Sequence, residues 1–224
     1  LPVWEYRWEG IHLEKRIFMP HRQNTVHVTY RLLDGPTTAR LELHPAVHFR
    51  GYEDPVGSEV KSPTATRYTM ATSGGMHLLS VENGKLPPLR LKIHGTEANR
   101  FIADERVTSE FVYPVEESRG YEFRGALWTP GHFEVDLPLG DCVTLMASAE
   151  PEEVMVALSP DEVVQCEQER RRRLILSALP QAQDETGAEL VLAADQFIIT
   201  PAGRIVDATR AAAMGNEVRT VIAG

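Results

Sequence analysis

The chain has 224 residues, of which 42% are hydrophobic and 25% are charged, and its formal net charge is −9. This composition offers enough apolar surface to offset chain entropy, so it excludes extended disorder and predicts a globular protein. The acidic excess disfavours a nucleic-acid or membrane partner, because both require a basic footprint. No apolar run approaches the roughly 18 residues of a membrane span, and the first residues do not form a signal peptide, so we expect a cytoplasmic protein.

Apolar and polar residues alternate along much of residues 1 to 149. An alternation with a period of two places one set of side chains on a buried face and the other in solvent, which is typical of antiparallel strands. Turn-forming pairs such as Asp34-Gly35 and Asn83-Gly84 separate the runs. We therefore predict on the order of ten strands in an antiparallel sandwich or barrel. The apolar positions of the clearest runs are Trp4, Tyr6, Trp8, Ile11, Leu13, Val26, Val28, Tyr30, Leu32, Leu89, Leu91, Ile93, Phe133, Val135 and Leu137.

Helical patterns begin at Ser159. The run Ser159-Pro160-Asp161-Glu162 combines a cap residue, a proline at the first helical position and a glutamate at the capping-box position. Helical spacing then continues to Ala178, and Pro180 ends it. We interpret residues 181–187 as a polar linker and residues 188–197 as a second helix.

Common catalytic sequence motifs are absent, including the phosphate-binding glycine loop, the Cys-x-x-Cys pair, His-Glu-x-x-His and Gly-x-Ser-x-Gly. His44 and His48 lie four residues apart and precede Glu53 and Asp54. Positions four apart on a strand share a face, so these residues fit a metal site in principle. Pro45 interrupts the strand between the histidines, however, and we favour two unrelated histidines at the end of a strand.

Three pairs of neighbouring acids occur at Glu53-Asp54, Asp104-Glu105 and Glu116-Glu117. Glycoside hydrolysis requires two carboxyl groups held about 5 to 10 Å apart across the scissile bond. Neighbouring residues of a strand point to opposite faces, so none of these pairs forms such a site by itself. Solvated loop charges are the favoured interpretation.

The aromatic row Trp4, Tyr6 and Trp8 would form a flat strip on one face of a strand. Such a strip is able to stack on the apolar faces of sugar rings. The alternative, which we favour, is that the rings pack in the core or beneath a partner domain, because aromatic residues dominate both environments.

Two short segments are dense in polar and aromatic groups near a glycine. They are residues 48–52 and residues 111–121, and each contains an arginine, a tyrosine and a nearby acid. This composition suits loops at the end of a sandwich, where binding sites are common. It suits equally well a hydrogen-bonded turn without a ligand, and the residues alone leave both interpretations open.

Eight segments, in their order and spacing, carry a resemblance to a known family. The segments are Trp4 to Tyr6, Leu13 to Arg16, Asn24 to Tyr30, Pro45 to Tyr52, Tyr113 to Gly120, Pro130 to Phe133, Leu192 to Phe197 and Thr220 to Gly224. With them the chain resembles the N-terminal domain of bacterial and archaeal-type glycogen debranching enzymes, the amylo-α-1,6-glucosidases. At residues 50–53 the chain reads Arg-Gly-Tyr-Glu, whereas the family often has an Arg-Asp-Tyr-His-like stretch.

The resemblance implies a galactose-mutarotase-like β-supersandwich followed by an (α/α)-barrel. It divides the chain into a β-sandwich domain at residues 1–158, a connecting helix and linker at 159–187, and the start of a catalytic helical barrel at 188–224. The whole enzyme would hydrolyse α-1,6-glucosidic branch linkages in glycogen or a related α-glucan. This chemistry needs two carboxyl groups and implies no metal ion and no organic cofactor.

The family's catalytic acids would lie beyond Gly224, so the resemblance assigns no catalytic residue in this chain. The β domain would brace the barrel and contribute loops to the rim of the sugar site. The candidates for this rim are Arg50, Tyr52, Glu116, Arg119 and Tyr121.

The expected partners are an α-glucan and the chain's own catalytic barrel, with neither nucleic acid nor membrane. We also expect the isolated chain to self-associate through apolar surface that the barrel would cover. Two alternatives remain open, namely a free-standing carbohydrate-binding module and a structural or interaction domain without sugar contact. Binding of maltooligosaccharides distinguishes these two alternatives.

Overall fold

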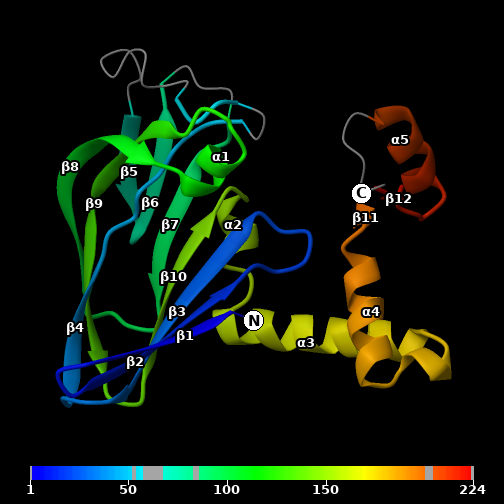
Figure 1. Cartoon of the computed structure of the whole chain (residues 1–224), viewed down its shortest axis with the longest axis horizontal. Coiled ribbons are helices and arrows are strands. Elements are labelled where there is room, and N and C mark those ends of the chain that lie inside the picture. The colour runs from blue at the N-terminus through cyan, green and yellow to red at the C-terminus, as the bar shows by residue number, and fades with distance from the viewer. Residues whose placement is uncertain (1, 52–53, 58–67, 83–85, 200–203, 223–224) are drawn as a thin grey trace. The chain divides into compact units, whose positions relative to one another are not determined.

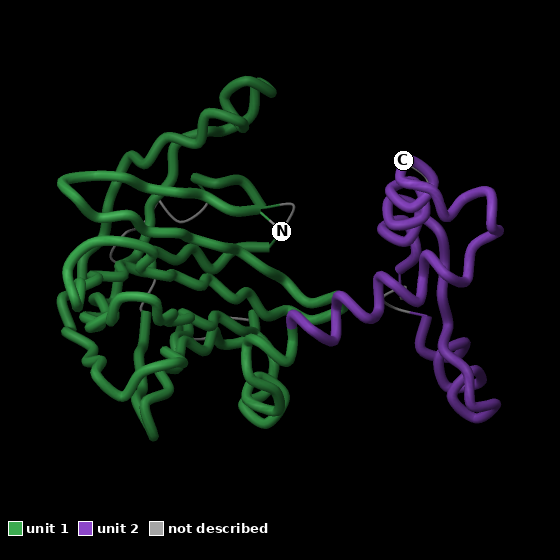
Figure 2. The backbone as a smooth tube through the Cα atoms, turned by 90° about the horizontal axis from the view of Figure 1, so that it is seen from below, with its two compact units in different colours: residues 1–163 green, residues 164–224 purple. Residues whose placement is uncertain are grey.

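The computed structural model describes residues 2–51, 54–57, 68–82, 86–199 and 204–222. It divides into two compact units, residues 1–163 and residues 164–224 (Figure 2). The first unit holds ten strands, β1 to β10, among the described residues, and the second is mainly helical. No helix in the described part of the chain is long and apolar enough to cross a membrane.

A seven-stranded sheet forms the larger layer of the first unit (Figure 1). Its strand order is β1-β2-β3-β10-β7-β6-β5, so the last strand of the unit, β10, inserts between β3 and β7. All neighbouring strands in this sheet pair antiparallel among the described residues. The strands are β1 (Val3–Trp8), β2 (Ile11–Phe18), β3 (Thr25–Asp34), β5 (Tyr68–Ser73), β6 (Met76–Val81), β7 (Leu89–His94) and β10 (Cys142–Ser148).

A three-stranded antiparallel sheet forms the second layer, in the order β4-β9-β8. It consists of β4 (Thr38–Leu43), β8 (Asn99–Val112) and the long β9 (Arg124–Pro138). The two sheets share one core, which confirms the mainly β, antiparallel prediction and fits a β-sandwich.

The core follows from the alternation that the sequence shows. On β9, Phe133, Val135 and Leu137 are at most 1% exposed, whereas the intervening Glu134 and Asp136 face outward. Leu32 on β3 and Val143 on β10 meet them from the large sheet and are equally buried. The period of two therefore identifies the inward face of these strands correctly.

The aromatic row on β1 does not pack into this core. Trp4, Tyr6 and Trp8 are 43%, 49% and 69% exposed. In the strand register Tyr6 lies opposite Leu13, which lies opposite the fully buried Leu32, so the row extends the inward face of the large sheet. The rings therefore do not pack in the core of this chain, and the other part of the expectation, that they pack beneath a partner domain, stays a prediction.

The helix predicted after Ser159 is confirmed as α3 (Pro160–Ser177). Both bonds of the capping box are formed, because the Ser159 N–H donates to Glu162 Oε2 at 2.8 Å and the Glu162 N–H donates to Ser159 Oγ at 3.4 Å. The division into three domains at residues 158 and 187 stays a prediction. The boundary between the two compact units, at residue 163, falls within this helix.

The predicted polar linker is largely folded. A short 3₁₀ turn, η1 (Pro180–Ala182), leads to α4 (Glu185–Asp195), and the Asp184 side chain caps α4 by accepting the Gly187 N–H at 2.7 Å. A Cβ on Gly187 would come within 2.6 Å of the Ala182 carbonyl. A glycine in this helix therefore permits close backbone contact instead of marking a linker. The unit also contains β11 (Ile198–Ile199), α5 (Ile205–Ala213) and β12 (Thr220–Val221).

Two buried histidines make the stability of the β-sandwich sensitive to acid. His27 on β3 and His77 on β6 are 2% and 6% exposed. Burial lowers the pKa of both below the ordinary value of 6.5, and His94 lowers that of His27 further. Below that value the unfolded chain binds more protons than the folded one. The stabilisation that comes from keeping both histidines neutral is therefore fully present above pH 6.5. It is lost as the pH falls from there through the lower pKa values of the folded protein.

We expect the unfolding midpoint of the protein to fall between about pH 7 and about pH 5, and to fall less in a His77→Gln variant. Glutamine does not titrate, and it is able to keep the hydrogen bond that joins Thr72 Oγ1 to His77 Nδ1 at 3.0 Å. Thermal unfolding followed by circular dichroism at several pH values measures this difference. Parallel pH profiles for the two proteins would contradict a role for His77.

Candidate functional site

A pocket of about 560 Å³ opens at the end of the sandwich where Arg50 and residues 54–56 meet the connection between β8 and β9. Four of the five predicted rim residues line it, namely Arg50, Glu116, Arg119 and Tyr121. The fifth, Tyr52, lies outside the described residues. The remaining lining residues are Asp54, Pro55, Val56 and Glu122.

The β8–β9 connection presents three of these side chains from a folded turn. Strand pairing ends at Val112 and Arg124, and the short helix α1 (Pro114–Ser118) lies in the interval. Pro114 suits the first helical position, because its missing N–H has no partner to lose there. Gly120 has a φ of 77°, which lets the chain reverse so that the Tyr121 N–H donates to the Glu116 carbonyl at 3.0 Å. The segment is therefore an ordered helical turn.

The opposite wall of the pocket is a turn that Arg50 stabilises. Arg50 Nη1 donates to the carbonyl of Asp54 at 2.8 Å, and the Asp54 carboxylate accepts the Gly51 N–H at 2.7 Å. Val56 is 2% exposed, and a Cβ on Gly125 would meet its carbonyl oxygen at 2.4 Å. The close backbone contact between Val56 and Gly125 holds this wall against β9.

The pocket combines hydrogen-bonding groups of both charges with an exposed ring. Arg50 and Arg119 supply donors, Glu116 and Glu122 supply acceptors, and Tyr121 is 65% exposed. Such a set is able to bind a neutral ligand that is rich in hydroxyl groups, because hydroxyls both donate and accept while an aromatic face stacks on apolar ring surfaces.

The acidic pair Asp104-Glu105 has structural contacts in β8. Asp104 forms an ion pair with Arg106, and Glu105 accepts the indole N–H of the buried Trp128 at 2.9 Å. The two carboxylates thus serve different neighbours, as expected for adjacent strand positions.

The two histidines considered for a metal site are not part of one described cluster. The ring of His44 stacks on that of His132 with centroids 4.6 Å apart. Asp54 instead belongs to the turn in the pocket wall, and Glu53 lies outside the described residues. The interpretation of His44 and His48 as unrelated is consistent with this arrangement, whereas His132 was not recognised from the sequence.

Sequence reasoning also missed Asp54 and Glu122 as members of the pocket. The sequence draws attention to Asp54 only beside the histidines and in the acidic pair with Glu53, although its position three residues after Gly51 is typical of a side chain that closes a turn. No short motif marks Glu122, because its place depends on where the chain leaves α1 and enters β9.

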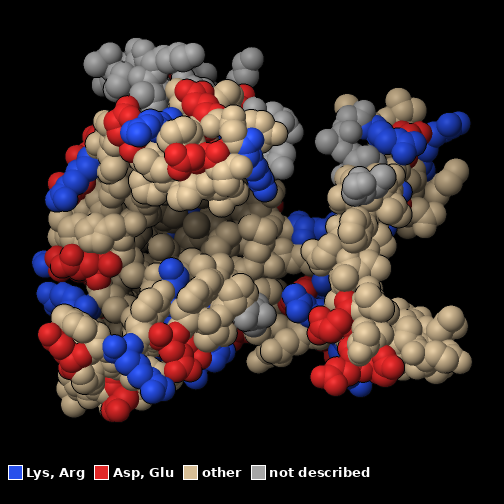
Figure 3. Space-filling model, viewed as in Figure 1, with Lys and Arg blue, Asp and Glu red and all other residues tan. Residues whose placement is uncertain are grey.

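The net charge of −9 is not concentrated on the visible face of the β-sandwich. Figure 3 shows acidic and basic side chains intermixed around a hollow whose lining is mostly uncharged. This face therefore lacks the single-sign patch that would attract a polyelectrolyte.

Comparison with known proteins identifies a family. None of the curated proteins is similar to the chain. The family model described as "Glycogen debranching enzyme N terminal" matches residues 1–144, which contain both walls of the pocket and every strand of the sandwich except most of β10. This match extends over more than half of the chain and covers six of the eight segments on which the resemblance rests, those that end by Phe133. We conclude that the chain belongs to the family of glycogen debranching enzyme N-terminal domains.

Proposed function

We propose that this chain is the non-catalytic N-terminal region of a cytoplasmic glycogen debranching enzyme that hydrolyses α-1,6-glucosidic branch linkages. The family match supports the parent enzyme. In this proposal the sandwich is of the galactose-mutarotase-like kind, and residues 188–224 begin a catalytic helical barrel. The helical character of the second unit is compatible with that role.

The observation that carries the proposal is the convergence of the rim candidates. Arg50 reaches the pocket from one segment, and Glu116, Arg119 and Tyr121 reach it from another that is distant in sequence. In the proposed role the arginines donate hydrogen bonds to glucose hydroxyls, Glu116 accepts them, and Tyr121 stacks on a pyranose ring. The pocket would hold part of the glucan close to the active site of the barrel.

Alanine at Arg119 or Tyr121 is expected to reduce kcat/KM of the full-length enzyme on a branched glucan by about tenfold, mainly through KM. One lost hydrogen bond or stacking contact is worth about 1–1.5 kcal/mol, which corresponds to such a factor. Steady-state kinetics of debranching measure it. Arg173→Ala is the control, because Arg173 is exposed, pairs with Glu169 at 2.8 Å and is not among the residues that line the pocket. Normal turnover and KM in both pocket variants would overturn the rim assignment.

The non-catalytic role has its own test. The chain by itself should release no glucose from a branched glucan, whereas the full-length gene product should. Hydrolysis by the chain alone would contradict the proposal. It would direct attention to the carboxylates of Asp54, Glu116 and Glu122, which share the pocket.

A carbohydrate-binding module is the second candidate, and the exposed aromatic row on β1 favours it. Trp4, Tyr6 and Trp8 form the row that would stack on a maltooligosaccharide. Calorimetric titration with maltoheptaose distinguishes the two surfaces. Loss of binding in Trp8→Ala but not in Arg119→Ala would place the sugar on the row, and the reverse would place it in the pocket. Absence of binding to the unmodified chain would favour the structural domain.

A further inference from the structure

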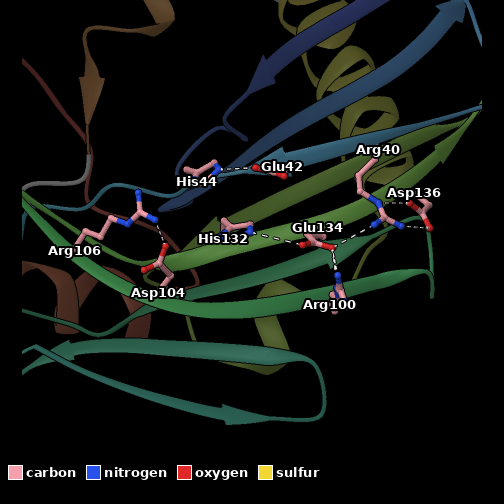
Figure 4. Close-up of polar contacts among 9 residues, drawn as sticks. All are labelled: Arg40, Glu42, His44, Arg100, Asp104, Arg106, His132, Glu134 and Asp136. Atoms are coloured by element: carbon pink, nitrogen blue, oxygen red, sulfur yellow. Dashed lines mark hydrogen bonds and ion pairs between the residues drawn. The ribbon is translucent and has the colours of Figure 1, made fainter.

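A second polar cluster lies on the outer face of the three-stranded sheet (Figure 4). Two short segments form it, Glu42-Leu43-His44 at the end of β4 and His132-Phe133-Glu134 in β9. They run antiparallel, with Glu42 opposite Glu134 and Leu43 opposite Phe133. Leu43 and Phe133 are buried in the core, so the histidines and glutamates point away from it.

The antiparallel register brings like residues together. The carboxylates of Glu42 and Glu134 share one cross-strand pair, and the rings of His44 and His132 stack beside them. One ligand atom each from Glu42, His132 and Glu134 lies within 4.8 Å of the others. His44 Nε2 is 3.4 Å from Glu42 Oε2, so a second imidazole lies next to this group of three, although it is not one of its members.

These separations are close to those of a tetrahedral metal site. Ligand atoms about 2.1 Å from a tetrahedral ion stand about 3.4 Å from one another. Glu42 and His44 have side chains 58% and 50% exposed, so they are able to change rotamer. Glu134 and His132, at 17% and 13%, supply the more rigid half of the site.

The charges around the cluster leave one carboxylate oxygen of Glu134 available. Arg100 contacts Oε2 of Glu134 at 2.6 Å, and Arg40 lies 3.6 Å from the same oxygen. Oε1 instead faces His132 Nε2 at 3.9 Å. Two glutamates directly opposite each other repel, so a cation between Glu42 and Oε1 of Glu134 would be favourable.

His132 presents one ring nitrogen to the cluster. Its Nδ1 is buried and has no hydrogen-bond partner among the described residues, whereas its Nε2 faces Oε1 of Glu134 at 3.9 Å. When Nδ1 carries the proton, the neutral imidazole keeps its lone pair on Nε2, and a metal ion is able to use it there. The ion would act through Nε2 and would not satisfy Nδ1.

We propose that Glu42, His44, His132 and Glu134 form a binding site for a divalent transition-metal ion, with Zn²⁺ the best match. Two imidazole nitrogens and two carboxylate oxygens suit Zn²⁺ in a four-coordinate site, whereas Mg²⁺ and Ca²⁺ prefer oxygen ligands alone. Protein side chains fill all four positions, which is typical of a structural ion. The ion would join β4 to β9 and stabilise the small sheet, independently of any role in glucan binding.

Titration of the chelator-stripped chain with ZnCl₂ tests the site. We expect one Zn²⁺ per chain, a rise in the unfolding temperature with Zn²⁺, and no comparable response to MgCl₂. His44→Gln and Glu42→Gln should each weaken Zn²⁺ binding at least tenfold. Both side chains are at least half exposed, so these variants should fold.

The matched control is His12→Gln. His12 also contacts a carboxylate, Glu5, at 3.0 Å, but these two residues belong to no cluster of three possible ligands among the described residues. This variant should bind Zn²⁺ like the unmodified chain. Equal affinity in the unmodified chain and in a His44→Gln/Glu42→Gln double variant would overturn the proposal, as would an equal loss in His12→Gln.

Discussion

Replacement of Trp128 by alanine is expected to lower the free energy of unfolding of the β-sandwich by about 3–5 kcal/mol. Trp128 on β9 is 3% exposed, and its ring stacks on Tyr68 with centroids 4.6 Å apart and planes 6° from parallel. Its backbone also exchanges two hydrogen bonds with Val47. Removal of the ring leaves a large cavity where these segments meet, and it leaves the carboxylate of Glu105 without the indole donor.

Chemical denaturation measures this loss, and the chain supplies a matched control. Trp8→Ala removes the same side chain at a position that is 69% exposed, so we expect a change within about 0.5 kcal/mol. Trp128→Phe keeps an aromatic ring but removes the N–H that donates to Glu105 at 2.9 Å, and should fall between the two. Similar losses in Trp128→Ala and Trp8→Ala would show that the structure assigns Trp128 the wrong environment.

Replacement of Arg170 by methionine is expected to destabilise the second unit by about 2–3 kcal/mol. Arg170 on α3 joins Glu167 on its own helix to Asp195 at the end of α4, with both contacts at 2.7 Å. Glu167 and Asp195 are only 9% and 12% exposed. Methionine at position 170 removes a positive charge that contacts both of these largely buried carboxylates. The estimate lies below the 3–5 kcal/mol of a fully buried pair because Arg170 is 27% exposed.

Hydrogen exchange of the α4 amides measures this change, and protection should fall by about 30- to 150-fold. Arg172→Met is the control, because the exposed pair of Arg172 and Glu169 is worth about 0–1 kcal/mol. An equal loss of protection in both variants would show that the contacts of Arg170 stabilise the second unit no more than the exposed pair of Arg172 does.

The pH dependence of this difference has a definite sign. Burial alone would raise the pKa of Glu167, but hydrogen bonds from Arg170 and Arg171 outweigh it and hold the pKa below the ordinary value of 4.5. The stabilisation is therefore present above pH 4.5 and is lost as the pH falls through the folded pKa. The difference between the unmodified chain and Arg170→Met should shrink in acid.

The inward faces of the strands could be predicted from the sequence, whereas their partners could not. Alternation identifies Phe133, Val135 and Leu137 as core positions because it depends only on neighbouring residues. The same pattern gave the wrong environment for Trp8, which continues the inward face at a point that the small sheet leaves uncovered. Whether an inward face is covered depends on the layout of both sheets, and local periodicity carries no information about that.

The candidate site shows the same limit. The composition of two loop segments drew attention to them, the family resemblance implied Arg50, Glu116, Arg119 and Tyr121 as rim residues, and the structure brings these four to one pocket. His132 and Glu134 could not be linked to Glu42 and His44, because their proximity follows from the pairing of β4 with β9 across about ninety residues. The helical turn α1 was also missed, since five residues are too few to show helical periodicity.

The place of β10 in the large sheet also determines when the sandwich is able to fold during synthesis. β10 is the last of its strands to leave the ribosome, yet it occupies the centre and pairs with both β3 and β7. At translation rates of about 5–20 residues per second, the N-terminal strands wait roughly 6 to 20 s for this partner. During that interval the apolar face around Leu32 and the aromatic row are open to other chains. Slower synthesis would lengthen the exposure, and molecular chaperones that bind apolar strands would shield it.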